Sequence, residues 1–273
     1  MRRQKLSLLL IGVLLVFVAL RPRIGYRAVR AVARLLPLDQ GYSVVASDNF
    51  VLYYDEEDAV AQGVLLQLEQ RLAELQEHLP DQSPKPIRVR LHATSDSMGR
   101  AIGGEYSATL GAYQLGKLEL LSPVAWHPRL GQAAALAVYE REGPVTHELA
   151  HLLLDYLCPT GYPVWFSEGF AQYWEMRLQG YVWDEGDWGW VKQPASLTSL
   201  ENSFRSLPET VAYQQSLSLM IYLYETVGDG GMQEMLLHLQ EGQSLQGALE
   251  QAVGHSLERM EANWQVWLQD RLW

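Results

Sequence analysis

Residues 143–172 read GPVTHELAHLLLDYLCPTGYPVWFSEGFAQ, and they contain an H-E-x-x-H motif from His147 to His151 in an apolar segment. Side chains four residues apart lie on the same face of a helix, so the two imidazoles can reach one point. Two neutral imidazoles at that spacing suit a Zn²⁺ ion, and the intervening Glu148 lies close enough to act on a metal-activated water. The stretch therefore predicts a helix that carries half of a metal site.

The third ligand is expected on the next helix. A catalytic zinc site usually has three protein ligands and leaves one position for water. Glu168 is the candidate, because it lies 17 positions after His151 within a second predicted helix, residues 164–178. An H-E-x-x-H string occurs by chance in roughly one protein in a hundred of this length, so the second element adds specificity. His147, His151 and Glu168 are therefore the predicted zinc ligands.

Two catalytic roles complete the expected chemistry. Glu148 is expected to take a proton from the water as general base and to pass it to the leaving amine as general acid. The oxyanion of the reaction needs a donor besides the metal. Tyr213, at the start of a later predicted helix, is the candidate donor, although as one of fourteen tyrosines it can equally be a packing residue. Helical spacing makes Asp155 and Gln172 candidates for orienting the ligands.

The motif and the later segment PVWFSEGFA, residues 163–171, carry a family resemblance. Together they resemble the gluzincins of the peptidase MA clan, and in particular the short bacterial peptidase MA-like domains, which share the Glu-Gly-Phe-Ala element with the M1 aminopeptidases. The resemblance extends from about residue 49 to the C-terminus. It implies a thermolysin-like zincin fold, a zinc cofactor and a peptide or protein substrate. The chain lacks a clear Gly-x-Met-Glu-Asn element, so the resemblance leaves endopeptidase and exopeptidase action open.

The N-terminus has the layout of a membrane anchor. Residues 6–20 are almost entirely apolar and follow three basic residues, as in a signal sequence. No small-x-small cleavage site follows, which favours an uncleaved anchor, although about 20 residues are usual for a span. We expect a single N-terminal segment to hold the protein at a membrane, with the catalytic domain outside the cytoplasm. Five arginines follow the segment, so the positive-inside rule does not decide the orientation.

A basic amphipathic segment, residues 24–36, comes next, and Pro37 ends it. Such a helix can lie on an anionic membrane surface or serve as a juxtamembrane linker, and the composition does not choose between them. We accordingly divide the chain into residues 1–37, the anchor and basic segment, and residues 38–273, the peptidase MA-like domain.

Charge and cysteine content exclude some functions. Eight of the 21 basic residues precede the first acidic residue, Asp39, so 13 basic residues remain against 32 acidic ones. Nucleic-acid affinity depends on neutralising phosphates with Lys and Arg, so no nucleic-acid partner is expected. Cys158 is the only cysteine, which excludes an internal disulfide and a cysteine-based zinc site. We expect its thiol to be buried and inert.

The segments around the motif predict an α+β fold, with a small mixed sheet and helices in the N-terminal half. The expected strands and helices are residues 49–54, 59–79, 87–92 and 130–142, with a hairpin formed by residues 108–114 and 117–121. The hairpin is either a sheet edge that holds a substrate backbone by strand addition or an ordinary structural hairpin. His92, on the polar face of its strand, is expected to face solvent.

The C-terminal half is predicted to be mostly helical. The expected helices are residues 209–227, 232–240, 244–252 and 257–272, with Gly228, Gly242 and Gly254 at caps and turns. Residues 181–192, which hold three tryptophans, are expected to form a surface loop near the cleft.

Three functional hypotheses remain. The first is a membrane-anchored zinc peptidase that hydrolyses peptide bonds with metal-activated water and a glutamate base. The second is a catalytically inactive zincin-fold protein that acts in binding or scaffolding at the membrane. The third is a metal-independent helical protein with an accidental motif. Glu148 and all three predicted ligands are present, which favours the first hypothesis.

Overall fold

The computed structural model describes residues 22–34, 41–103, 109–158, 162–183 and 188–271. The predicted membrane anchor, residues 6–20, lies outside these ranges. Within them, every helix is too short or too polar to cross a membrane.

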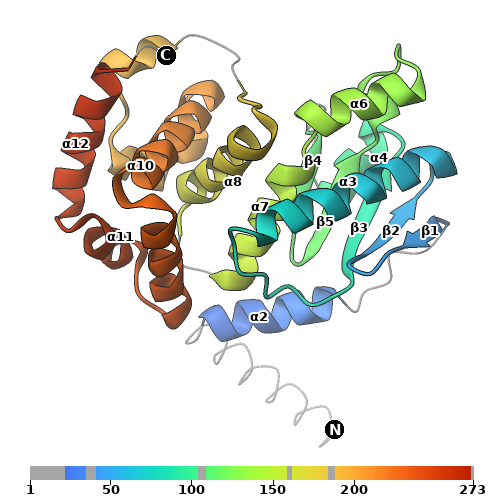
Figure 1. The fold of residues 1–273 in the computed structure, drawn as a ribbon, viewed down its shortest axis with the longest axis horizontal. Helices are drawn as coiled ribbons and strands as arrows, with labels where there is room; N and C mark the ends of the chain where they lie inside the picture. The colour runs from blue at the N-terminus through green and yellow to red at the C-terminus, as the bar shows by residue number, and fades with distance from the viewer. Residues whose placement is uncertain (1–21, 35–40, 104–108, 159–161, 184–187, 272–273) are drawn as a thin grey trace, which may run out of the picture.

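In the described part of the chain, five strands form one mixed sheet (Figure 1). They are β1 (Ser43–Ala46), β2 (Phe50–Tyr54), β3 (Ile87–His92), β4 (Gly111–Gln114) and β5 (Lys117–Leu121), and their order in space is β1-β2-β3-β5-β4. The central strands β2, β3 and β5 are parallel, and β1 and β4 pair antiparallel at the two edges. Parallel neighbours need crossover connections, which α3 (Asp58–Gln76) and α4 (Ser95–Ile102) supply. The predicted hairpin is therefore β4–β5, and β4 is an edge strand.

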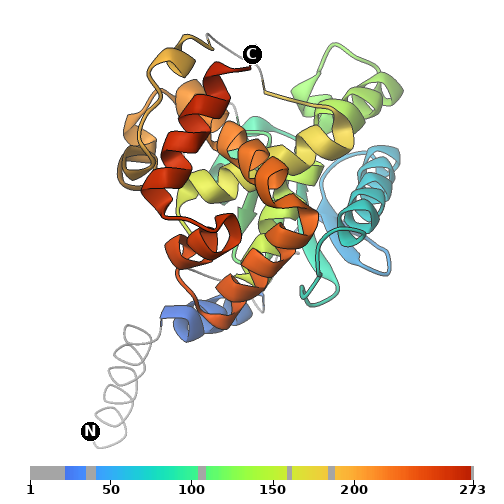
Figure 2. The same ribbon diagram turned by 60° about the vertical axis from the view of Figure 1, so that its left-hand side comes forward.

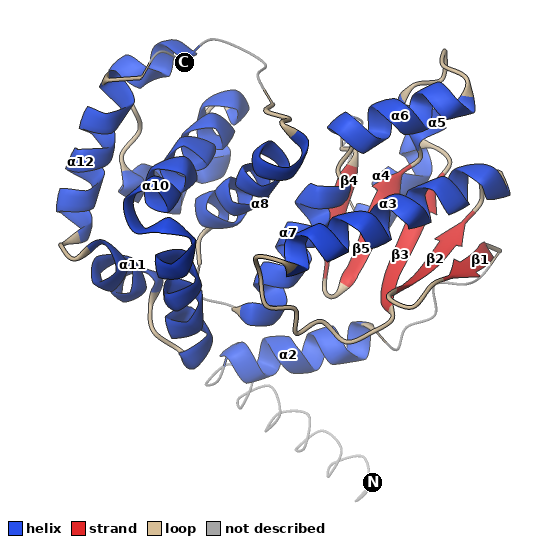
Figure 3. Cartoon of the chain, viewed as in Figure 1, coloured by secondary structure: helices blue, strands red, loops and turns tan. Residues whose placement is uncertain are grey.

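Helices make up the rest of the fold, as Figure 3 shows. After α5 (Pro123–Trp126) and α6 (Gln132–Glu142), the motif lies on α7 (Val145–Leu157) and Glu168 on α8 (Val164–Gln179). The C-terminal part contains η1 (Trp188–Lys192), α9 (Leu197–Ser203), η2 (Phe204–Ser206), α10 (Glu209–Glu241), α11 (Leu245–Val253) and α12 (Leu257–Gln269). This arrangement confirms the predicted α+β fold with a mostly helical C-terminal half.

Three glycines end or interrupt helices where the sequence predicts it. Gly228 has φ 69° and ψ 175°, and it separates the two halves of α10 that were expected as two helices. Gly242 and Gly254 take left-handed conformations at the ends of α10 and α11. A residue without a Cβ adopts positive φ without steric cost, which is why glycine occupies these caps.

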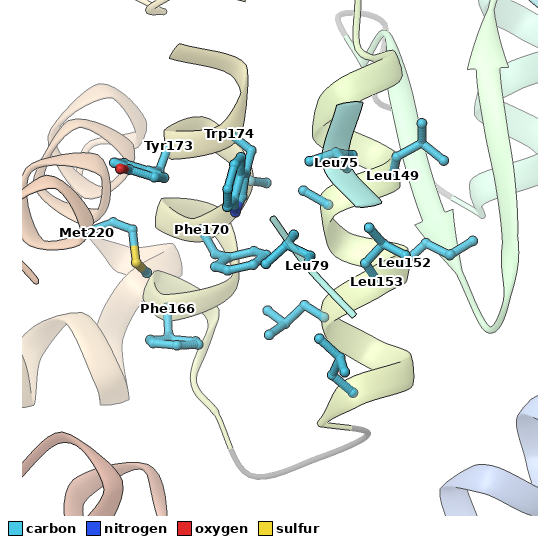
Figure 4. Close-up of a cluster of buried hydrophobic side chains, with 14 of the residues drawn as sticks. Leu75, Leu79, Leu149, Leu152, Leu153, Phe166, Phe170, Tyr173, Trp174 and Met220 are labelled. Carbon is cyan, nitrogen blue, oxygen red and sulfur yellow. The ribbon is translucent and has the colours of Figure 1, made fainter. Parts of the chain in front are cut away.

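The core places α7 between the sheet-side helix α3 and the C-terminal helices. Figure 4 shows leucines of α7 facing aromatic side chains of α8, with Leu79, which follows α3, drawn between them. The residues in this layer are all nearly or fully buried: Leu75, Leu79, Leu149, Leu152, Leu153, Phe166, Phe170 and Trp174. Cys158, at the end of α7, is also buried, which confirms that prediction. Because both ligand-bearing helices are packed along their length, their relative position is rigid.

His92 does not face solvent, contrary to the prediction. Its side chain is buried, with Nε2 2.8 Å from Glu119 on β5 and Nδ1 3.1 Å from Ser97 on α4. The alternating sequence of β3 correctly predicts which side chains share its polar face. The prediction of solvent exposure is wrong because α4 packs beside that face. Lys117 and Arg90 lie beside Glu119, so the polar face is a buried charge network.

The basic segment forms α2 (Pro22–Ala33), which lies across the bottom of the fold in Figures 1 and 2. Arg30 is buried and its guanidinium forms an ion pair with Asp155 of α7 at 2.7 Å. Val29 and Val32 lie largely exposed on the outer side. One side of α2 therefore packs on the domain. The division at residue 37 stays a prediction, and these contacts cross it.

The crossing of α8 and α10 depends on a glycine next to Glu168. A Cβ built on Gly169 would lie 2.3 Å from the backbone carbonyl oxygen of Ser216, so no larger residue fits while the helices keep their separation. The helix that carries the third predicted ligand is thus held against α10 by direct backbone approach.

We expect Gly169→Ala to lower the free energy of unfolding by about 2–3 kcal/mol, because the added methyl group overpacks a buried helix crossing. Urea denaturation followed by circular dichroism measures the change. Gly230→Ala is the matched control: a Cβ there meets nothing within 4 Å, so alanine should leave stability unchanged or raise it by up to about 1 kcal/mol. Equal denaturation midpoints for the two variants would contradict this account.

Candidate metal site and cleft

The three predicted metal ligands converge at one point. The Nε2 atoms of His147 and His151 lie 3.0 Å apart, and Oε2 of Glu168 lies 3.4 and 3.6 Å from them. These three residues form the group of potential metal ligands found among the described residues. One turn of α7 supplies both histidines, and the first turns of α8 supply the carboxylate.

The spacing fits a small tetrahedral ion. Zinc binds nitrogen and carboxylate oxygen at about 2.0–2.2 Å, so tetrahedral ligand atoms lie about 3.4 Å apart. The observed separations of 3.0, 3.4 and 3.6 Å bracket that value. Two imidazoles and one carboxylate are also a donor set that catalytic zinc sites use. By geometry and chemistry, these residues can hold a divalent ion.

Hydrogen bonds on the far side of each ring set which nitrogen faces the centre. Nδ1 of His147 donates to Glu175 at 2.8 Å, and Nδ1 of His151 lies 2.9 Å from the hydroxyl oxygen of Ser167. A carboxylate can only accept, so Nδ1 of His147 carries a proton, and when the ring is neutral its Nε2 presents a lone pair to the centre. Ligating histidines in metal sites are usually oriented in this way.

These orienting partners are not the ones that the sequence suggested. The carboxylate of Asp155 turns away to Arg30 and Tyr113, and the amide of Gln172 donates to the backbone oxygens of Glu168 and Tyr213. Glu175 was missed, although it follows Glu168 by seven residues, which is two turns on the same helix face.

The electrostatics of the centre favour positive charge between the carboxylates. Burial alone would lower the pKa of His147, but the charges of Glu175 and Glu168 outweigh it and raise that pKa well above its usual value. Burial likewise acts to raise the pKa of Glu168, yet the two neighbouring imidazoles hold it well below its usual range. The centre is therefore built to receive a cation, either a proton or a metal ion.

Glu148 lies beside the centre with little access to solvent. It is 5% exposed and lines the cleft. Burial raises the pKa of Glu148, and the nearby imidazoles oppose that rise only in part. A carboxylate with a raised pKa next to a reactive centre is suited to accept and return a proton.

A glycine of the edge strand makes room for this carboxylate. A Cβ on Gly111 would lie 2.7 Å from both Cγ and Oε1 of Glu148 and 2.8 Å from Pro144. Strand β4 therefore approaches the start of α7 as closely as a backbone can. The predicted hairpin and the predicted base are direct neighbours.

A cleft of about 800 Å³ opens over the centre. Its walls come from β4, from the starts of α7 and α8, and from the segment that leads into α10. The lining residues include Thr109, Gly111, Tyr113, Gln114, His147, Glu148, His151, Glu168, Phe204, Arg205 and Tyr213. The cleft thus runs between an exposed sheet edge and the candidate metal ligands, which suits an extended chain molecule.

Tyr213 lines this cleft, as its predicted role requires. Burial and the charges of Glu168, Glu209 and Glu148 raise its pKa, so its hydroxyl stays protonated near neutral pH and can donate a hydrogen bond. Its ring contacts Phe204 and Trp183, each at 5.5 Å between ring centroids. Trp183 belongs to the predicted tryptophan-rich loop. Trp190, in the short helix η1, is buried and donates to Gln214, so this end of the predicted loop packs on α10.

Comparison with known proteins identifies one family. A model of the Peptidase MA superfamily matches residues 129–270, which contain the motif helix, the Glu168 helix and the C-terminal helices. None of the curated proteins matches the chain.

We expect Glu175→Gln to weaken the affinity of the full-length protein for Zn²⁺ by roughly 10- to 100-fold, because the amide oxygen accepts from Nδ1 of His147 without the negative charge that strengthens this bond and makes the imidazole a better metal ligand. Competition with a chromogenic chelator measures this affinity. Glu234→Gln, an exposed change on α10, is the matched control and should bind like the wild type. Unchanged affinity for both variants would show that Glu175 does not orient a metal ligand.

Proposed function

The chain belongs to the Peptidase MA superfamily, and on that basis we propose that it is a zinc-dependent peptidase whose ligands are His147, His151 and Glu168. The family indicates a hydrolase that acts on peptide or protein substrates. The observation that carries the zinc assignment is the convergence of two imidazole nitrogens and one carboxylate oxygen at separations of 3.0 to 3.6 Å.

Zinc, when bound, supplies Lewis-acid polarisation of the scissile carbonyl and lowers the pKa of water toward neutrality. The protein supplies proton transfer: the Glu148 carboxylate accepts a proton from the attacking water and returns it to the leaving nitrogen. Its closeness to the His147–His151 pair and its location in the cleft wall support this role.

Strand β4 is the proposed substrate platform. Among the described strands it pairs only with β5, so its outer backbone groups are free to bond with an added strand. Residues 111–114 line the cleft. An extended peptide paired with this edge would pass over Glu148 and the metal ligands, and backbone pairing would hold its scissile bond there.

Tyr213 is the proposed donor to the oxyanion. It lies across the cleft from β4, and its hydroxyl is close enough to Glu168 and Glu148 to sense both charges. A hydrogen-bond donor that is already in place beside the reacting groups stabilises developing negative charge without reorganising.

The alternative is a protein that keeps this fold and its ligands but only binds peptides or proteins. The two functions differ in whether Glu148 acts on water. Glu148 lines the cleft and lies close enough to His147 and His151 for their charges to act on it, a location suited to proton transfer with water, which favours the peptidase.

Replacing Glu148 by Gln should lower kcat by roughly 10²- to 10⁴-fold, because the amide cannot accept the proton of water. Hydrolysis of a mixed peptide library, followed by mass spectrometry, provides the measurement, with zinc content determined in parallel. Glu142→Gln, at the end of α6, where the side chain is 42% exposed, should retain full activity. Hydrolysis at the wild-type rate by Glu148→Gln, or none by the wild type, would reject the proposed peptidase.

Gly111→Ala tests the contact between the edge strand and the base. The added methyl group would collide with the Glu148 side chain, so we expect kcat to fall by about tenfold or more while zinc content is retained. Gly131→Ala is the control, since a Cβ there meets no atom within 4 Å. Should both variants keep wild-type kinetics, the tight approach of β4 to Glu148 has no part in catalysis.

A further inference from the structure

Arg30 of helix α2 packs against the C-terminal part of α7, the helix that carries the H-E-x-x-H motif. Nη1 of Arg30 donates to the carboxylate of Asp155 at 2.7 Å and to the backbone oxygen of Asp155 at 2.8 Å. Both side chains are almost fully buried, with 8% and 5% of their surface exposed. A buried ion pair of this kind is costly to disrupt, because removal of one partner leaves the other charged and desolvated.

The same arginine lies against the turn of the β4–β5 hairpin. Its guanidinium stacks on the ring of Tyr156, 3.6 Å from the centroid. A Cβ on Gly116, in the turn, would lie 2.7 Å from the hydroxyl of Tyr156 and 3.3 Å from Cγ of Arg30. The turn residues Leu115 and Gly116 have φ 48° and 86°. Helix α2 therefore supports this tight turn from below, at the end of the strand that lines the cleft.

Asp155 connects α2 to the edge strand itself. Its carboxylate accepts a hydrogen bond from Tyr113 on β4, in addition to the bond from Arg30. Tyr113 lines the cleft. A chain of polar contacts thus runs from Arg30 through Asp155 to Tyr113, and it joins segments 125 and 42 residues apart in sequence.

An edge strand needs such support more than a central strand does. Strand β4 has four residues and one neighbouring strand in the described sheet, so ladder bonds restrain it from one side only. Its position over α7 then depends on side-chain contacts, among which are the hydrogen bonds from Tyr113 to Asp155 and from Gln114 to the backbone oxygen of Ile102. A displacement of about 1 Å is enough to impair a reaction that requires aligned groups.

We propose that Arg30 is a positioning residue for substrate binding: through Asp155 and Tyr113 it holds the edge strand β4 in the place where a peptide adds to it. Helix α2 then contributes to substrate binding and belongs to the functional domain. This inference rests on the proposed function of β4 as substrate platform. It also moves the boundary of the functional unit to at least residue 22, upstream of the predicted boundary at residue 37.

The test compares four single variants and one double variant of the full-length protein. Arg30→Gln removes the charge, Arg30→Lys keeps it without the planar fork, and Tyr113→Phe removes a single hydroxyl. Arg27→Gln is the matched control, since Arg27 lies one turn away on α2 and is exposed. We measure KM and kcat on a peptide substrate, zinc content, and hydrogen exchange of peptides that cover residues 109–121.

We expect Arg30→Gln and Tyr113→Phe each to raise KM by roughly tenfold with a smaller change in kcat. Both should speed amide exchange in β4 and retain zinc, and Arg30→Lys should lie between them and the wild type. The double variant Arg30→Gln/Tyr113→Phe should be no worse than the more impaired single variant, because both changes break one chain of contacts. Arg27→Gln should match the wild type in every measurement.

Wild-type exchange and KM in both Arg30→Gln and Tyr113→Phe would overturn the inference, as would equal effects of Arg27→Gln. Should Arg30→Gln fail to fold, Tyr113→Phe decides alone, because it leaves the ion pair in place. Failure of the proposed function has a different signature: the wild type hydrolyses nothing, and the exchange of β4 in the variants then decides whether Arg30 positions the strand.

Discussion

The structure depends on bringing two imidazole lone pairs and a carboxylate within 3.0 to 3.6 Å of one another. Positive charge at the centre, from a proton or a metal ion, stabilises this arrangement, and the fold holds the three groups around it with rigid helices. The leucine face of α7 packs on the aromatic face of α8 (Figure 4), and Glu175 and Ser167 hold the rings on the side away from the centre. The hydrophobic core on which both helices pack therefore fixes the geometry of the site.

Two glycines set the distances that the site requires, and each does so by permitting contact at backbone level. Gly169 lets α8 lie directly on α10, which positions Glu168, and Gly111 lets β4 lie directly on Glu148. A methyl group at either position would separate the elements by more than the tolerance of a metal site or a proton transfer. The geometry of the site therefore depends on two close contacts, one between α8 and α10 and one between β4 and α7.

The sequence predicted what depends on short spacings and missed what depends on distant partners. The H-E-x-x-H spacing placed two imidazoles on one helix face, and the helical caps and the sheet strands followed from local patterns. Glu175 could have been found by the same helical period. Asp155 was assigned to the imidazoles because it is one turn beyond His151, but Arg30, which pairs with it, lies 125 residues away. His92 was placed in solvent because alternation tells which residues share a face of a strand, and not what covers that face.

The position of α2 resolves a conflict that the proposed role of β4 as substrate platform creates. A strand that accepts a peptide must leave one edge unpaired, and the same vacancy deprives it of half the bonds that would hold it in place. A second neighbouring strand would hold β4 in place but would also occupy the edge at which a peptide would bind. The support must therefore come from contacts on another side of β4. Tyr113 is bonded to Asp155 of α7, and Arg30 of α2 packs between Tyr156 and the hairpin turn at Gly116. These contacts reach β4 and its turn from α7 and α2, and β5 is the one described strand that pairs with β4. Helix α2, which the sequence analysis placed outside the domain, therefore contacts the residues that hold the edge strand β4 in position.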